Sequence, residues 1–146
     1  MLAKVVYVSM TGNTEEIADY VVEEFENQGV EVEKIEADDA EEDVFDDADI
    51  SVVATYTYNN GEIPEDFGDF PEDLGEQDLS GKTYGVVGSG GKENHAPTFC
   101  FAVDSFEEIF AKTGAKKGHE SIKIDEAPDD DDRKQLKEFV EALVKA

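Results

Sequence analysis

Basic residues, cysteine and long apolar runs are all scarce in this chain of 146 residues. Its 12 lysines and arginines face 38 aspartates and glutamates, which leaves a formal net charge of −26. A surface this acidic repels nucleic acid and anionic membranes, so we expect neither as a partner. It attracts proteins with basic docking faces, although adaptation to high salt would produce the same composition. Both explanations of the acidity are kept at this point.

The single cysteine, Cys100, excludes an intrachain disulfide framework. No apolar run approaches the roughly 20 residues that a membrane-spanning helix needs. Met1 and Leu2 lead almost directly into a first apolar strand, so we expect no secretory signal and a cytoplasmic monomer. Hydrophobic residues still make up 39% of the chain, enough for residues 1–146 to form one domain with a substantial core.

Segments with the patterns of strands and helices alternate along the whole chain. Short apolar runs predict buried strands, and apolar residues at helical spacing predict helices between them. Strands covered by helices on both faces predict an α/β fold, a doubly wound sandwich around a five-stranded parallel sheet in the order 2-1-3-4-5. The predicted strands are residues 3–8, 30–35, 50–55, 83–87 and 121–124; helices are predicted from Thr14, from Phe99 and after Pro128, with a short helix over 38–47 anchored by Val44 and Phe45.

The first loop, Ser9-Met10-Thr11-Gly12-Asn13-Thr14, lies where such a sheet reverses its winding and binds ligands. Hydroxyl groups, an amide and a glycine meet there at a helix start, where N–H groups lack intrahelical partners and the dipole is positive. The loop has no lysine or arginine, so it could hold a phosphate without neutralising it. It lacks the Gly-Lys-Ser/Thr of a P-loop, and an ordinary helix N-cap is the alternative explanation.

Motifs at three strand ends together resemble the flavodoxin family. Ser-x-Thr-Gly-Asn-Thr at 9–14 is similar to its FMN phosphate loop, and the likeness continues in Ala-Thr-Tyr-Thr-Tyr at 54–58, Gly-Ser-Gly at 88–90 and Ala-Val-Asp at 102–104. The compact fifth strand, without a long insertion, resembles the short-chain branch. The resemblance covers the whole chain and implies one flavodoxin-like domain that binds FMN without a covalent bond.

In flavodoxins the second loop carries an aromatic side chain that stacks on the flavin and a residue whose peptide flips during reduction. By position, the resemblance assigns these roles to Tyr58 and Asn59; ordinary packing of the tyrosines is the alternative. Asn59-Asn60 departs from the Gly-Asp pair common in the family, and asparagine adopts a positive φ at greater cost than glycine. The predicted cofactor-binding residues of this loop are Thr55, Tyr56, Thr57, Tyr58, Asn59, Asn60 and Gly61.

The third loop, from Gly88 to Cys100, lacks the second stacking tyrosine of the family pattern. Either His95 covers the outer flavin face or Phe99 approaches it from the helix start, and the alternative for His95 is an ordinary exposed loop residue. We interpret Cys100 as a small buried apolar residue and not as a nucleophile. The residues of this loop predicted to bind the cofactor are Ser89, Gly90, Gly91, His95, Phe99 and Cys100.

The resemblance implies a low-potential electron carrier, with no catalytic residue and no metal site. FMN would carry one electron at a time between a flavin or ferredoxin reductase and an acceptor metalloenzyme. A receiver domain shares this topology but needs acidic residues after the first strand and an aspartate after the third, where Ser9 and Thr55 stand. Two alternatives are kept: a flavodoxin-like activator of manganese ribonucleotide reductase, which also uses a Thr-Gly-Asn-Thr loop, and a non-redox binding module.

Overall fold

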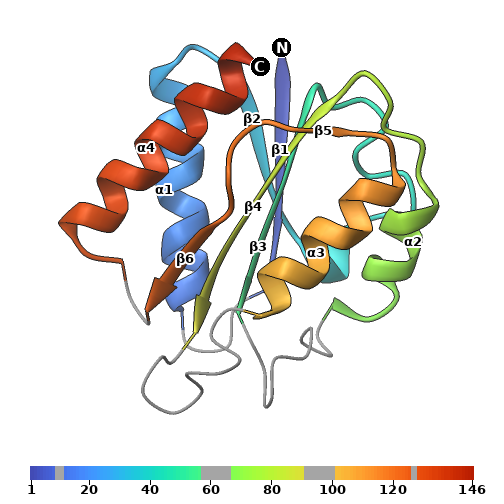
Figure 1. Ribbon diagram of the computed structural model, residues 1–146, viewed down its shortest axis with the longest axis horizontal. Helices are drawn as coiled ribbons and strands as arrows, with labels where there is room; N and C mark the ends of the chain where they lie inside the picture. Colours follow the sequence, from blue (N-terminus) through green and yellow to red (C-terminus); the bar gives the residue numbers. More distant parts are fainter. Residues whose placement is uncertain (9–11, 57–66, 91–100, 126–127) are drawn as a thin grey trace.

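A computed structural model describes residues 1–8, 12–56, 67–90, 101–125 and 128–146. Strands and helices alternate within these ranges, as the sequence predicts (Figure 1). Among the helices of the described ranges, none is both long enough and apolar enough to cross a membrane. The elements are β1 (Leu2–Tyr7), α1 (Asn13–Asn27), β2 (Glu31–Glu36), the 3-10 turn η1 (Ala37–Asp39), β3 (Ile50–Tyr56), α2 (Phe70–Glu76), β4 (Thr83–Gly90), α3 (Phe101–Lys112), β5 (Lys116–Lys117), β6 (Ile122–Asp125) and α4 (Asp130–Lys145).

All the strand pairs in the sheet are parallel, and the strand order 2-1-3-4-5 is confirmed. The fifth position differs from the prediction of one strand, because β5 and β6 both pair with β4, one after the other. Gly118 lies between these two segments, and a Cβ atom there would come within 2.5 Å of Leu143 Cδ2 and 2.6 Å of Thr83 Cγ2. Only glycine allows the chain to pass this close to α4 and β4 at the interruption.

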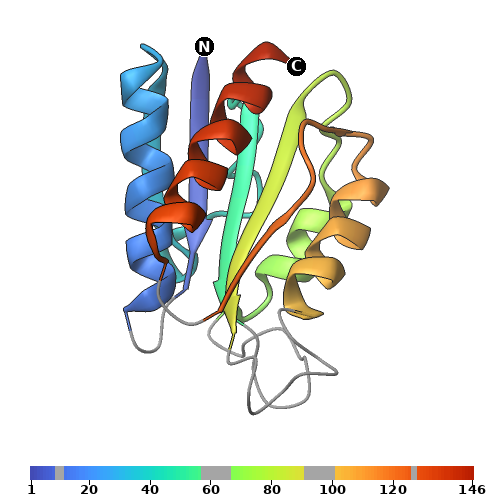
Figure 2. The same cartoon turned by 60° about the vertical axis from the view of Figure 1, so that its left-hand side comes forward.

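Helices cover both faces of the sheet, α1 and α4 on one face and α2 and α3 on the other (Figures 1 and 2). Each face has its own buried cluster, as expected for parallel strands that are apolar on both sides. The cluster under α1 and α4 contains Ile17, Val21 and Phe25 together with the predicted inward-facing residues of the last helix, Leu136, Phe139, Val140 and Leu143. The other cluster is rich in rings, with Phe45, Phe67, Phe70, Phe106 and Phe110.

The segment between β2 and β3 corrects one sequence prediction. A short helix over 38–47 is wrong, because only the three residues of η1 are helical and turns follow them. The run of acidic side chains explains this, since an apolar helical stripe is missing. Val44 and Phe45 nevertheless anchor the segment as predicted, with 7% and 0% of their surfaces exposed.

Helix α2 is absent from the sequence prediction. It has only seven residues, and its buried side chains are Phe70 and Leu74. About two turns with one apolar pair are too short to show helical periodicity. Pro71 marks the helix start, a position that proline favours, and could have served as a signal.

Candidate functional site

The three loops that the sequence singles out leave the sheet from neighbouring strands. Tyr7 in β1 pairs with Ala54 in β3, and Tyr56 at the end of β3 pairs with Ser89 in β4. The carboxyl ends of these strands therefore meet at one edge, the lower edge in Figure 1. The predicted site would lie at this edge, the switch point of a doubly wound sheet, and its position stays a prediction.

Gly12 forms the N-cap of α1 with a φ of 92° and a ψ of −12°, in the left-handed region that side chains disfavour. Its carbonyl accepts a hydrogen bond of 3.0 Å from the N–H of Glu16, which begins the helix. A Cβ atom on Gly12 would meet no atom of the described residues within 4 Å. The glycine thus allows a sharp turn into α1, whose N-terminus is the positive end of the helix dipole.

Two hydroxyl groups from distant parts of the chain meet at this edge. Thr14, in the first turn of α1, and Ser89, near the end of β4, are joined by a hydrogen bond of 2.9 Å between their side-chain oxygens. Thr14 is 1% exposed and Ser89 is 4% exposed. The contact links the first loop to the third, and either hydroxyl can donate.

The end of β3 is packed tightly against β4. Thr55 is fully buried, and its hydroxyl donates to the carbonyl of Tyr56 at 2.9 Å. A Cβ atom on Gly88 would lie 2.4 Å from Val103 Cγ2 and 2.8 Å from the carbonyl oxygen of Thr55. Gly88 is therefore needed for β3, β4 and α3 to approach one another.

Several predicted site residues can be compared with the structure and others cannot. Gly12, Asn13, Thr14, Thr55, Tyr56, Ser89 and Gly90 lie at the carboxyl edge, and the structure brings their backbones together there. The remaining predicted residues lie outside the described residues, and their roles stay predictions; these are Ser9, Met10, Thr11, Thr57, Tyr58, Asn59, Asn60, Gly61, Gly91, His95, Phe99 and Cys100.

A network of hydrogen bonds and ion pairs between α1 and the strands β1 and β2 was not predicted from the sequence. The Tyr7 hydroxyl donates to Glu15 at 3.0 Å, and burial together with this hydrogen bond raises the pKa of Tyr7 to about 12. Lys34 extends from β2 to Asp19 at 2.6 Å and to Glu15 at 3.5 Å. A lysine thus stands beside the first turn of a helix whose own loop has none, supplied by a neighbouring strand 19 residues from Glu15.

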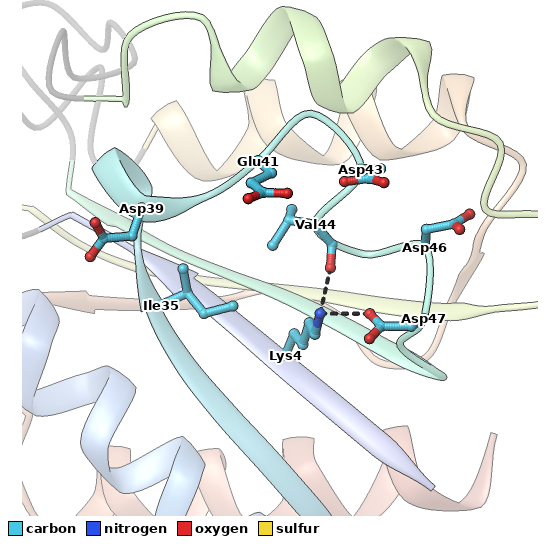
Figure 3. Close-up of a pocket in the computed structure, with 8 residues that line it drawn as sticks. All are labelled: Lys4, Ile35, Asp39, Glu41, Asp43, Val44, Asp46 and Asp47. Carbon is cyan, nitrogen blue, oxygen red and sulfur yellow. Dashed lines mark hydrogen bonds and ion pairs between the residues drawn. The ribbon is translucent and has the colours of Figure 1, made fainter.

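A hollow lies on the α2/α3 face of the sheet, beside the segment between β2 and β3 (Figure 3). Its volume is about 430 Å³, and it is lined mostly by acidic residues together with Lys4. The amine of Lys4 pairs with Asp47 at 2.5 Å and donates to the carbonyl of Val44 at 2.9 Å. Burial lowers the pKa of Lys4, but the nearby carboxylates of Asp47 and Glu33 raise it by more. The pKa of Lys4 therefore lies above its ordinary value. The lysine is already satisfied, and we assign no ligand to this hollow.

The fold places the chain among the doubly wound α/β proteins, a class that binds ligands at this carboxyl edge of the sheet. Comparison with known proteins narrows the class. The flavodoxin family model matches residues 5–139, and the chain belongs to the flavodoxin family. The assignment confirms the predicted fold class, FMN as the cofactor and electron transfer as the function.

Individual relatives agree with this assignment. The chain is 36% identical over 135 residues to the probable flavodoxin 2 of Bacillus subtilis, covering 92% of this chain and 88% of the relative. It is 39% identical over 131 residues to a flavodoxin of Maridesulfovibrio salexigens, with 88% of each chain covered. A solved flavodoxin structure from Streptococcus pneumoniae superposes with a TM-score of 0.95 at 46% identity, covering 99% of both chains.

The donor groups of the described residues fit the phosphate end of FMN. A phosphate needs hydrogen-bond donors, and the start of α1 offers backbone N–H groups, the helix dipole and the buried hydroxyls of Thr14 and Ser89. These donors match a phosphate, and the first loop itself contains no basic side chain.

Proposed function

We propose that residues 1–146 form one FMN-binding domain that carries single electrons, with the FMN phosphate at the start of α1. The observation that supports the placement is the glycine-capped N-terminus of α1 with the buried Thr14–Ser89 hydroxyl pair beside it. Buried hydroxyl groups and the positive end of a helix both favour a bound phosphate. The cofactor-binding residues would be those of the three loops predicted above.

The residues at this edge would position the cofactor. Residues 9–14 would surround the phosphate, Thr55 and Tyr56 would contribute backbone contacts to the ring and its chain, and Tyr58 would stack on the ring. Ser89 and Gly90 would carry the third loop to the other side of the ring. We assign no residue the role of acid, base or nucleophile on a separate substrate.

The bound flavin supplies the redox chemistry, and the protein adjusts its potential. The charge of the chain favours a low potential, because a net charge of −26 disfavours adding negative charge to the ring. The first loop contributes to this effect, since it would hold a phosphate without a basic side chain that neutralises it. The reduced protein would therefore be a strong electron donor.

Partner proteins would have basic docking faces. Between Lys34 and Lys82 the sequence contains no basic residue, so a long acidic stretch crosses the segment around η1 and helix α2. We infer that a reductase and an acceptor metalloenzyme bind through complementary charge, which speeds association and weakens with salt. A cytoplasmic location and a monomeric state stay predictions.

A flavin titration tests the proposed function. FMN is added to the apoprotein and the fluorescence and absorbance of the flavin are followed, with riboflavin as the analogue that lacks the phosphate. We expect FMN to bind much more tightly than riboflavin, and the loaded protein to accept electrons in two separate steps on reduction. Protein that stays colourless and ignores added FMN would instead support the non-redox binding module.

A pair of variants tests where the phosphate lies. Thr14→Val removes a hydroxyl from the proposed phosphate site, whereas Thr113→Val removes a buried hydroxyl that donates to the carbonyl of Phe110 at 2.5 Å, outside the three loops. We expect Thr14→Val to lower FMN affinity and to leave riboflavin affinity nearly unchanged. Equal effects of the two variants on FMN affinity would contradict this placement.

A further inference from the structure

Glu15 stands in the first turn of α1, where its charge has two opposite effects. An acidic side chain near a helix N-terminus stabilises the helix through the dipole. The same carboxylate repels a phosphate bound at that N-terminus, and the repulsion extends over about 10 Å at 0.1 M salt. Because the first loop has no basic residue, a group that offsets the charge of Glu15 would lower its repulsion of a phosphate bound here.

The structure shows two groups that hold it. The Tyr7 hydroxyl, on β1, donates to Glu15 Oε2 at 3.0 Å. The amine of Lys34, on β2, lies 3.5 Å from the same oxygen and 2.6 Å from Asp19 Oδ1, one turn further along α1. Lys34 also lies 5.3 Å from the centre of the Tyr7 ring. One cation thus pairs with two carboxylates of α1, and the hydroxyl of Tyr7, which also lies 3.4 Å from Glu36 Oε1, donates to Glu15.

We propose that Lys34 is a positioning residue for the phosphate of the cofactor. Together with Tyr7, it orients the Glu15 carboxylate toward β2 and offsets its charge, so that a phosphate at the start of α1 meets less repulsion. The inference rests on the proposed function, because it needs FMN phosphate at that helix start. It adds that a charged residue outside the three loops, Lys34, contributes to the binding of FMN.

Exposure distinguishes this role from a structural one. The side chains of Lys34 and Glu15 are 31% and 46% exposed, and ion pairs this accessible contribute little to folding stability. Lys34 lies on β2, which borders only β1, and its amine reaches the partly exposed carboxylates of α1. Loss of its charge should alter phosphate affinity more clearly than stability.

The test compares charge changes at Lys34 with the same changes at Lys117. Lys117 pairs with Glu107 at 2.9 Å and lies beside Tyr84, at the opposite end of β4 from the site. We expect Lys34→Met to weaken FMN binding roughly three-fold at low salt, and Lys34→Glu to weaken it about nine-fold, because it changes two charges. Lys117→Met and Lys117→Glu should each weaken FMN binding by less than about half the fold-change of the corresponding Lys34 variant.

Further measurements distinguish an effect of the Lys34 charge from an effect of its side-chain packing. Lys34→Arg keeps the cation and should retain near-wild-type FMN affinity, and added salt should bring the Lys34→Met value toward wild type. Combining Lys34→Met with Glu15→Gln should recover most of the lost affinity, since the repelling carboxylate is then gone. Riboflavin lacks the phosphate, so its affinity should not follow the Lys34 series.

The results would distinguish a failure of the proposed function from a failure of the role of Lys34. If wild-type protein does not prefer FMN to riboflavin, the proposed function itself is wrong. If it does, but the Lys34 and Lys117 variants change FMN affinity equally, the role of Lys34 is overturned while the proposed function stands. A Lys34→Met loss that persists at high salt, or that Glu15→Gln does not reverse, also overturns the role.

Discussion

Helices α1 and α4 cover the same face of the sheet, yet their N-termini are built in opposite ways. At α4, Asp129 is the N-cap: its side chain accepts from the N–H of Asp132 at 2.9 Å, and the side chain of Asp132 accepts from the N–H of Asp129 at 3.1 Å. At α1, the N-cap is Gly12, which has no side chain to accept anything. One helix start is capped by its own carboxylates, and the other has a glycine cap without a side chain.

The difference shows how a helix N-terminus that binds a ligand differs from one that is only capped. Both helices carry acidic residues in the first turn, so charge alone does not separate them. A reciprocal capping box satisfies the donors of α4 within the chain, which leaves little for a ligand. The glycine cap of α1 supplies no such side-chain contact, so we expect the N–H donors of this helix to face the phosphate. Four substitutions test this contrast, from the largest expected effect to the smallest.

Gly12→Asp would make the start of α1 resemble that of α4. The new carboxylate would compete for the helix donors and repel the phosphate, and we expect FMN affinity to fall about 100-fold or more, roughly 3 kcal/mol. Gly81→Asp is the matched control, because Gly81 has a φ of 83° and similar open space. Both variants should lose about 1 kcal/mol of stability, from the positive φ. Equal FMN affinities in the two variants would refute the contrast.

Ser89→Ala removes the partner that holds Thr14 in the first turn of α1. We expect a loss of about 1–2 kcal/mol in the free energy of unfolding, because the buried Thr14 hydroxyl would lose its hydrogen bond. Ser51→Ala is the control: Ser51 is fully buried in β3, and its hydroxyl has no hydrogen-bond partner among the described residues. Denaturant unfolding should find Ser51→Ala neutral or stabilising. A similar loss in both would show that the Thr14–Ser89 contact contributes nothing specific.

Asp129→Ala opens the start of α4. We expect a loss of about 1 kcal/mol in the free energy of unfolding, the usual cost of removing an N-cap carboxylate. FMN affinity should be unchanged, because this helix start lies outside the proposed site. Thermal unfolding and a flavin titration on the same preparation measure both quantities. A weaker affinity for FMN would mean that α4 takes part in binding after all.

The smallest effect concerns the exposed acids of the two first turns. Glu16→Gln at α1 should strengthen FMN binding about two-fold at low salt, because it removes a charge near the phosphate. Asp131→Asn at α4 should leave FMN affinity unchanged and slightly lower stability. Isothermal titration at two salt concentrations makes the comparison, and the gain at Glu16 should vanish at high salt. A gain at Asp131 of equal size would point to net charge as the cause.

Much of the fold was predictable because its signals are local. The buried strands, the amphipathic stripe of α1 and the inward-facing residues of α4 all follow from the spacing of apolar residues along short segments. The same locality explains the errors. Helix α2 is too short to show a period, and the acidic segment around η1 has no apolar stripe to decide between helix and turn. The division of the last strand into β5 and β6 depends on contacts of Gly118 with distant residues.

By itself, the sequence determined the class of fold, the three loops at its carboxyl edge and the flavodoxin motifs in them, because each is encoded by neighbouring residues. Only the tertiary structure decided which distant side chains support the site. Thr14 meets Ser89 across 75 residues, and Glu15 meets Lys34 across 19. Such contacts depend on the order and register in which strands pair, and parallel pairing brings together residues that no local pattern connects.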